Sequence, residues 1–163
     1  MLFRSKIIIH TSNFRKVKRI EDVIAVFSQI IKEIPAKLLL IGDGPERSHI
    51  EKVCREFNTC DWVTFLGKQE AIEEILSIGD LFILPSESES FGLAALEAMA
   101  CEVPVISSNA GGIPEVNIHG FTGYLSEVGD VDDMAQNAIS LLKDPNLLAT
   151  FKKNALKIGR AHV

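Results

Sequence analysis

The sequence predicts an α/β fold: a doubly wound parallel sheet of about six strands with helices on both faces. Short apolar runs alternate along the chain with longer amphipathic stretches. Aliphatic residues dominate the 47% hydrophobic content and aromatic residues make up only 7%, a mixture typical of α/β layers. Clusters of glycine, serine, lysine and glutamate follow the apolar runs. The 163 residues fit a single domain.

The expected strands are the short apolar runs. Leu38-Leu39-Leu40-Ile41 shows the pattern best, because a strand that is covered on both faces is apolar throughout. The pattern predicts strands at residues 7–11, 38–41, 62–66, 81–84, 103–106 and 121–125.

The expected helices lie between and after these strands. Apolar residues at helical spacing follow the first strand, and Pro35 ends that helix. Pro45 suits the first turn of the second helix. Strands joined by right-handed helical crossovers form a parallel sheet, which binds ligands beyond the carboxyl ends of its strands. Helices are expected at residues 20–34, 45–57, 70–78, 92–101, 131–143 and 146–157.

Composition and missing motifs exclude several classes of function. A net charge of −5 argues against a broad nucleic-acid-binding surface, so an anionic ligand needs a few well-placed cations. Cys54, Cys60 and Cys101 form no CxxC pair and are expected to be reduced thiols. No apolar run approaches the length of a membrane span, so a cytoplasmic protein is expected. Motifs of dinucleotide oxidoreductases, P-loop NTPases and serine hydrolases are absent, and the histidines lack metal-ligand spacing.

The segment 85–100 is the richest in chemistry, because it runs from a strand end through a polar loop into a helix. The first free N–H groups of that helix are expected near Phe91, Gly92 and Leu93, where they form a ready phosphate site. Glu89 and Glu97 flank this site, and carboxylates accept hydrogen bonds from sugar hydroxyls. The alternative is that Glu89 is an ordinary helix-start acid. Glu97 interrupts an apolar helix and is expected to need a partner.

Three further loops follow strand ends. Residues 13–19 carry a dense group of cations that either neutralise a diphosphate or form a solvated basic loop. Residues 107–115 contain Gly111-Gly112 and form either a second anion-facing loop or a simple turn. Gly42 and Gly44, with Gly67 and Lys68, also end strands, but glycine is common there in any doubly wound fold.

The two ends of the sequence resemble translated sequencing adapters. Residues 1–5 and 158–163 are therefore expected to be foreign, and the natural protein to run from about residue 6 to residue 157.

The segment 85–100 resembles the signature of the retaining family 4 glycosyltransferases, which have the GT-B architecture. In that signature two glutamates are separated by seven residues and followed by Ala-Met-Ala, as Glu89 and Glu97 are here. The resemblance covers nearly all of residues 6–157. Other motifs follow in the family's order at residues 42–45 (Gly-Asp-Gly-Pro), 65–67 (Phe-Leu-Gly), 104–105 (Pro-Val) and 111–112 (Gly-Gly).

The resemblance implies that residues 6–157 are the Rossmann-like, donor-binding C-terminal half of a GT-B enzyme. A missing N-terminal domain would hold the acceptor. Arg15 and Lys18 would contact the donor diphosphate, Glu89 would bind the transferred sugar, and Glu97 would bind the ribose. Among the remaining residues, backbone groups of Phe91, Gly92 and Leu93 would bind the distal phosphate and sugar, Gly67 and Lys68 would pair with uracil, and Gly42 and Gly44 would shape the cleft floor.

Within the family, residues 10–19 (His-Thr-Ser-Asn-Phe-Arg-Lys-Val-Lys-Arg) are most similar to the enzymes that open bacillithiol biosynthesis. These enzymes transfer GlcNAc from UDP-GlcNAc to L-malate. Two positions depart from the family pattern. Asn13 replaces the usual arginine, which would shift the diphosphate contact to Arg15. Glu102 stands where relatives have glycine, at a cost of about 1 kcal/mol if the position needs a positive φ.

The resemblance implies front-face transfer with retention and no metal requirement, because Arg15, Lys18 and the helix N-terminus would stabilise the departing phosphate. The fragment alone is expected to bind UDP weakly and to transfer nothing. Two alternatives stay open: another family 4 enzyme with a different donor or acceptor, and a non-catalytic nucleotide-binding module.

Overall fold

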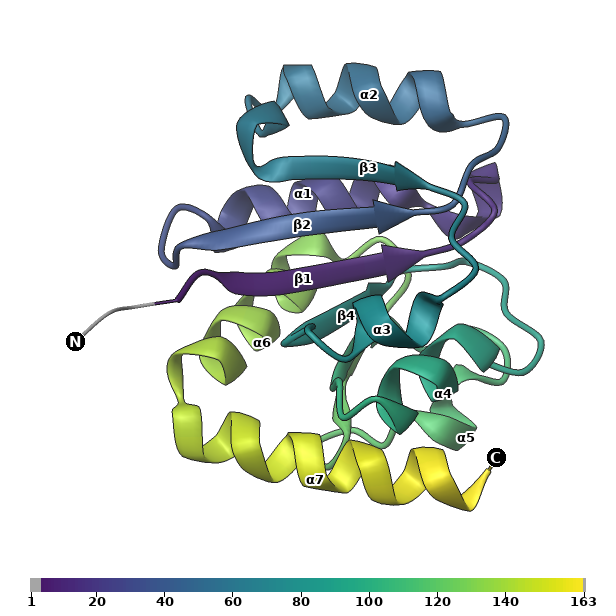
Figure 1. Cartoon of the computed structure of the whole chain (residues 1–163), viewed down its shortest axis with the longest axis vertical. Coiled ribbons are helices and arrows are strands. Elements are labelled where there is room, and N and C mark those ends of the chain that lie inside the picture. The colour runs from purple at the N-terminus through teal and green to yellow at the C-terminus, as the bar shows by residue number, and fades with distance from the viewer. Residues whose placement is uncertain (1–3, 163) are drawn as a thin grey trace.

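A computed structural model describes residues 4–162 and confirms the expected fold class (Figure 1). All strand pairs of the sheet are parallel, and their spatial order is β3-β2-β1-β4-β5-β6. The chain reverses its direction of progress across the sheet between β1 and β4, which is where doubly wound folds bind ligands. The strands are β1 (Lys6–Thr11), β2 (Ala36–Ile41), β3 (Val63–Gly67), β4 (Leu81–Leu84), β5 (Val105–Ser108) and β6 (Gly123–Ser126).

Helices pack on both faces of the sheet and enclose two apolar cores. On one face, Phe27 of α1, Ile50 of α2 and Met134 of α6 pack with Leu38 and Leu40. The other core contains residues of α3, α4 and α5. The long last helix contributes to both cores and lies along α4. The helices are α1 (Ile20–Ile30), α2 (Arg47–Glu56), α3 (Ile72–Leu76), α4 (Leu93–Ala100), α5 (Ile113–Val116), α6 (Val131–Lys143) and α7 (Pro145–Ala161), with short 3-10 turns η1 (Lys16–Lys18) and η2 (Cys60–Trp62).

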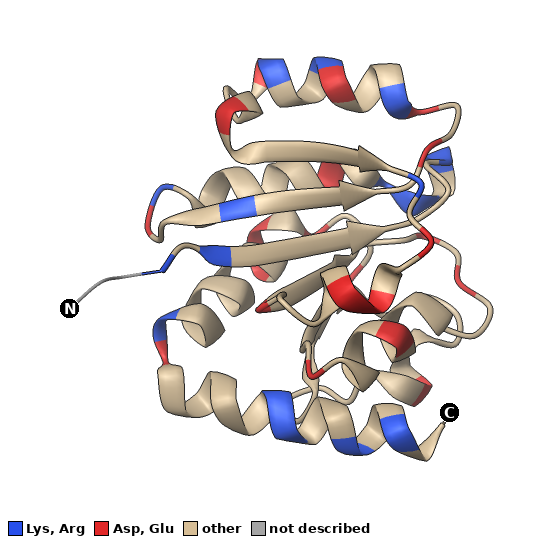
Figure 2. Ribbon diagram, in the orientation of Figure 1, with Lys and Arg blue, Asp and Glu red and all other residues tan. Residues whose placement is uncertain are grey.

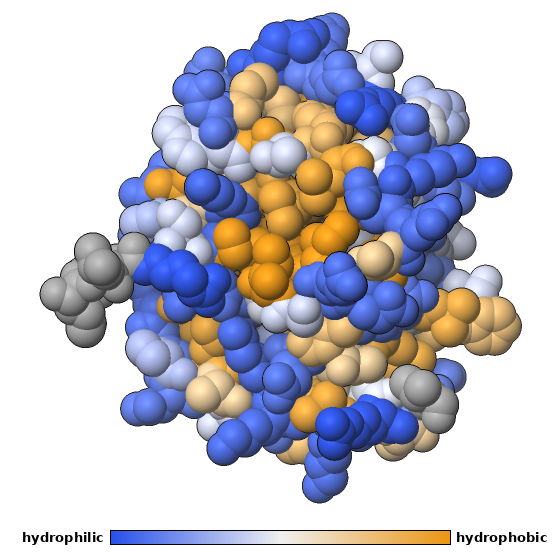
Figure 3. Space-filling model, in the orientation of Figure 1, coloured by the Kyte–Doolittle hydropathy of each residue, from blue (hydrophilic) through white to orange (hydrophobic). Residues whose placement is uncertain are grey.

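The second face is covered less completely over β1–β3 than over the rest of the sheet. Ile7 and Leu39 point to this face and are only partly buried, whereas their neighbours Ile8 and Leu38 on the opposite face are fully buried. In the space-filling view apolar residues gather at the centre of this face (Figure 3). Among residues 4–162 no helix has both the length and the hydrophobicity needed to cross a membrane.

Most expected elements are present, with shifted boundaries. The fifth and sixth strands begin two residues later than expected, at Val105 and Gly123. Pro45 precedes α2 instead of opening it, because α2 begins at Arg47. The first helix ends at Ile30, before Pro35. Periodicity locates a helix better than its ends, which depend on local turns.

The segments expected to be foreign are described only in part. Residues 1–3 and 163 lie outside the described residues. The last helix continues through the boundary at residue 157 to Ala161, and Gly159 lies against the backbone of Ala100. Where the natural protein begins and ends stays a prediction.

Glu102 has the left-handed backbone that the family's glycine at this position suggested, with φ of 65°. It follows the end of α4, where its N–H bonds to the carbonyl of Met99 and the N–H of Val103 bonds to that of Ala98. This arrangement ends a helix and favours glycine.

We expect Glu102→Gly to stabilise the chain by about 1 kcal/mol, because glycine removes the left-handed strain. The melting temperature would then rise by roughly 2–4 °C. Lys153→Gly is the matched control, since Lys153 is an exposed residue in the ordinary conformation of α7. That change should destabilise by about 1 kcal/mol. A loss of stability in Glu102→Gly would contradict the argument.

Candidate active site

A pocket of about 500 Å³ opens at the carboxyl ends of β1 and β4. It lies where the order of the strands reverses, between the loop after β1 and the loop that leads into α4. Acidic and basic segments both occur at this edge of the sheet (Figure 2). The lining residues are Thr11, Ser12, Asn13, Lys18, Ser88, Glu89, Ser90, Phe91, Gly92, Leu93, Ala94 and Glu97.

The two loops that line the pocket are joined by three contacts. The backbone N–H of Glu87 donates to the carbonyl of Val17 at 2.9 Å. Lys18 Nζ lies 2.7 Å from Glu89 Oε1, and Arg19 Nη1 lies 3.3 Å from Glu87 Oε2. The basic loop (residues 13–19) is therefore held against the loop at residues 85–92, called the acidic loop below. The alternative of a freely solvated basic loop does not describe Lys18.

Glu89 is fixed by a second donor. The hydroxyl of Ser86 donates to Glu89 Oε1 at 3.0 Å, which is the same oxygen that contacts Lys18. Ser86 is fully buried, and its carbonyl accepts a hydrogen bond from the hydroxyl of Ser108 on β5. The carboxylate of Glu89 thus has a defined position at the pocket wall.

His10 and Ser12 form the support beneath the pocket. His10 Nδ1 lies 2.8 Å from the carbonyl of Ile83, which only accepts hydrogen bonds, so Nδ1 carries the proton. His10 Nε2 then accepts from the hydroxyl of Ser12 at 2.9 Å. Complete burial lowers the pKa of His10 from 6.5 to about 4, an effect reinforced by Lys18 and opposed by the hydrogen bond to Ile83 and by Glu89. The neutral ring orients the Ser12 hydroxyl.

A pair of glycines backs the acidic loop from the other side. Gly111 has φ of 53°, and a Cβ atom added there would lie 1.8 Å from the carbonyl oxygen of Glu89. The N–H of Gly112 donates to the same carbonyl at 2.9 Å. These glycines pack against the backbone of the acidic loop and do not line the pocket, so the loop at residues 107–115 supports the loop that carries Glu89.

The N-terminus of α4 faces the pocket. Gly92 is the N-cap residue in the left-handed conformation, with φ of 65°, and the helix begins at Leu93. The N–H groups of the first turn have no partner within the helix and favour an anion. Phe91 and Leu93 are 72% and 61% exposed, which leaves their side chains available at the pocket mouth.

Glu97 lines the pocket from within α4, where it was expected to need a partner. Its side chain is exposed to solvent, so burial does not impose that need. Partial burial and the nearby carboxylate of Glu73 raise its pKa above the usual value.

Several residues expected at the site lie outside the pocket. Arg15 is exposed on the basic loop and does not line it, so its contact with a diphosphate stays a prediction. Gly42 and Gly44 lie against the carbonyls of Ser12 and Asn13, which do line it. Among the others, Gly67 accepts a hydrogen bond from the N–H of Gly42, and Lys68 follows it at the end of β3.

Some lining residues were not anticipated as site residues. Thr11 is the last residue of β1 and Ser12 follows it, whereas Ser88 and Ser90 lie in the loop between β4 and α4. Their position at or after the carboxyl ends of strands is the sequence signal for them. The role of Ser86 beneath Glu89 had no signal, because serine is common in loops.

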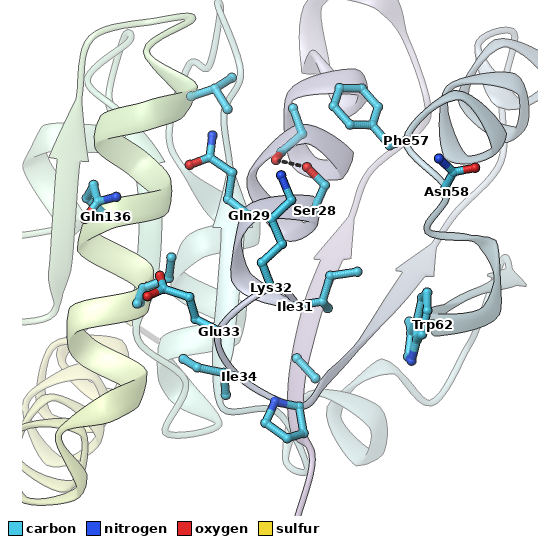
Figure 4. Close-up of a pocket in the computed structure, with 15 residues that line it drawn as sticks. Ser28, Gln29, Ile31, Lys32, Glu33, Ile34, Phe57, Asn58, Trp62 and Gln136 are labelled. Carbon is cyan, nitrogen blue, oxygen red and sulfur yellow. Dashed lines mark hydrogen bonds between the residues drawn. The ribbon is translucent and has the colours of Figure 1, made fainter.

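A second, larger cavity of about 950 Å³ lies near the amino ends of β2 and β3 (Figure 4). Its walls are α1, the end of α2 and part of α6, and the exposed rings of Phe57 and Trp62 stand on one side of it. The charged loops meet at the other end of the sheet, beyond the carboxyl ends of β1 and β4.

Among residues 4–162 no three histidine, cysteine, aspartate or glutamate side chains are grouped to hold a metal ion.

Comparison with protein families gives one match over almost the whole chain. Residues 4–158 match the family described as glycosyl transferases group 1. This chain belongs to that family. The fold described above is therefore that of a glycosyltransferase domain.

Relatives in the group 1 family include enzymes with several donors and acceptors. The chain is 56% identical over 142 residues to N-acetyl-alpha-D-glucosaminyl L-malate synthase of Bacillus anthracis, covering 87% of this chain and 37% of that enzyme. It is 34% identical to a sulfoquinovosyl transferase of Arabidopsis thaliana, over 77% of this chain and 25% of that protein. The chain thus matches 37% and 25% of the length of these two relatives.

Solved structures of GT-B glycosyltransferases share the fold closely. Staphylococcus aureus TarM, crystallised with UDP, superposes with a TM-score of 0.90 at 27% identity, over 94% of this chain and 32% of that one. Anabaena HepE in complex with UDP gives a TM-score of 0.89 at 26% identity, over 96% of this chain and 44% of that one.

Proposed function

We propose that the chain is the donor-binding half of a retaining glycosyltransferase that moves GlcNAc from UDP-GlcNAc to L-malate. One observation carries the proposal: Lys18 and the free N–H groups of α4 meet in a pocket that Glu89 and Glu97 bracket. The 56% identity to the malate enzyme supports this choice of donor and acceptor. The UDP-bound relatives support a nucleotide donor.

In this proposal each part of the pocket has one role. The diphosphate is bound by Lys18 and by the backbone N–H groups of Gly92 and Leu93 at the N-terminus of α4. Glu89 accepts hydrogen bonds from the hydroxyls of the transferred sugar, and Glu97 from those of the ribose. The acceptor is held by a part of the enzyme that lies outside this chain.

The reaction breaks the bond between the anomeric carbon and the diphosphate oxygen and forms a bond from the same face to the malate hydroxyl oxygen. The malate proton passes to the departing diphosphate. The protein contributes fixed positive potential where negative charge develops, from Lys18 and the helix N-terminus. Because these groups supply that potential, the proposed reaction requires no divalent metal.

Titration calorimetry with UDP tests the donor site. Lys18→Ala should weaken UDP binding by about tenfold or more, because a charge-assisted contact to the phosphates is lost. Lys16→Ala is the matched control, since Lys16 is an exposed cation in the same loop outside the pocket. EDTA should leave binding unchanged. Equal effects of the two substitutions, or no binding of UDP, would contradict the proposed site.

An assay with UDP-GlcNAc and L-malate tests whether the donor site and the acceptor site lie on separate parts of the enzyme. The isolated chain should bind UDP weakly and form no product. Robust transfer by the chain alone would refute an acceptor site elsewhere. A screen of other nucleotide sugars distinguishes the GlcNAc enzyme from a different group 1 transferase or a non-catalytic binding module.

A further inference from the structure

The pocket proposed to bind a diphosphate has an unfavourable charge balance. The charged side chains that line it are Lys18, Glu89 and Glu97, so acids outnumber cations. Lys18, the one cation among the described residues that line it, is already occupied, because its Nζ lies 2.7 Å from Glu89 Oε1. A diphosphate entering this pocket must compete with Glu89 for the ammonium group.

The competition matters because both partners are largely shielded from water. The side chains of Lys18 and Glu89 are only 21% and 12% exposed. If Lys18 turns toward a phosphate, the Glu89 carboxylate loses its counter-charge in a place where water replaces it poorly. If Lys18 contacts both the Glu89 carboxylate and the phosphate, these two anions lie close together and repel each other.

Ser86 is placed to hold Glu89 during this exchange. Its buried hydroxyl donates to the same Oε1 atom at 3.0 Å, and Ser86 lies two residues after β4, not on the basic loop. Because its carbonyl is held by the hydroxyl of Ser108, its position does not depend on Lys18. The carboxylate then keeps its position and has room for new hydrogen-bond donors from the pocket.

We propose that the Lys18–Glu89 ion pair couples recognition of the diphosphate to recognition of the sugar, with Ser86 as the positioning residue of Glu89. The inference rests on the proposed function. UDP alone breaks the ion pair and leaves Glu89 without new donors. A nucleotide sugar breaks it and supplies sugar hydroxyls in place of Lys18. The intact pair therefore weakens UDP binding selectively and favours release of UDP after transfer.

Calorimetry with UDP and UDP-GlcNAc on matched variants tests this coupling. Glu89→Gln should tighten UDP binding about fivefold, because the competing charge disappears. The preference for UDP-GlcNAc over UDP should shrink toward one. Glu87→Gln is the control: it removes a charge from the same loop, but Glu87 pairs with Arg19 and does not line the pocket. Its affinities should stay within about twofold of the unchanged chain.

Ser86→Ala gives an independent readout. It should weaken UDP-GlcNAc about fivefold and UDP much less, because only the sugar relies on a fixed Glu89. A merely structural role would weaken both ligands equally. Melting curves of each variant verify that it is folded.

The outcomes separate this inference from the proposed function. If the unchanged chain binds neither ligand, the proposed function fails and the coupling fails with it. If it binds both, but Glu89→Gln leaves UDP affinity unchanged or weaker, the coupling alone is overturned. Tighter UDP binding in Glu89→Gln but not in Glu87→Gln supports it.

Discussion

Replacing Gly111 by alanine is expected to destabilise the chain by about 3 kcal/mol and to abolish measurable UDP binding. The added Cβ would lie 1.8 Å from the carbonyl oxygen of Glu89, and the left-handed backbone of Gly111 adds its own strain. Relief of that overlap must displace the loop that carries Glu89. Thermal unfolding should show a melting temperature lower by roughly 6–12 °C.

Gly120→Ala separates strain from displacement. Gly120 also has a positive φ, of 78°, but nothing lies within 4 Å of an added Cβ. This variant should lose about 1 kcal/mol and bind UDP as the unchanged chain does. If Gly111→Ala behaves like Gly120→Ala in both measurements, the close packing of the two loops does not matter for the site.

Acidification should destabilise the chain through His10. Burial lowers the pKa of His10 to about 4, whereas the unfolded chain titrates near the ordinary value of 6.5. The unfolded state therefore binds more protons between these values, and stability falls as the pH falls through this window. The full loss corresponds to about 3 kcal/mol between pH 6.5 and pH 4.

Urea unfolding at several pH values measures this effect. His10→Asn should lower stability at neutral pH, because the contacts with Ile83 and Ser12 are altered, and should flatten the dependence between pH 6.5 and pH 4. His49→Asn is the control, since His49 is exposed on α2. An unchanged slope in His10→Asn would show that other groups cause the acid sensitivity.

The fold class, the strand runs and the segment that carries the chemistry could all be predicted from the order of the residues. Leu38–Ile41 is apolar throughout, which indicates a strand inside a layered sheet, although Leu39 is only partly buried. This pattern is local, so the sequence displays it directly. Glu89 and Gly92 could also be predicted as site residues, because a strand, a polar loop and a helix start follow one another along the chain. The left-handed residue at position 102 followed from the family pattern.

Which of these residues lie next to one another depends on the folding of the whole chain. Lys18 and Glu89 are 71 positions apart and form an ion pair, whereas Arg15, in the same loop as Lys18, turns outward. Glu97 was expected to need a partner because its neighbours are apolar, but its own side chain is exposed. Residue patterns encode periodicity and local backbone preference. Distances between loops depend on how the strands cross and how Gly111 packs, and no local pattern contains that information.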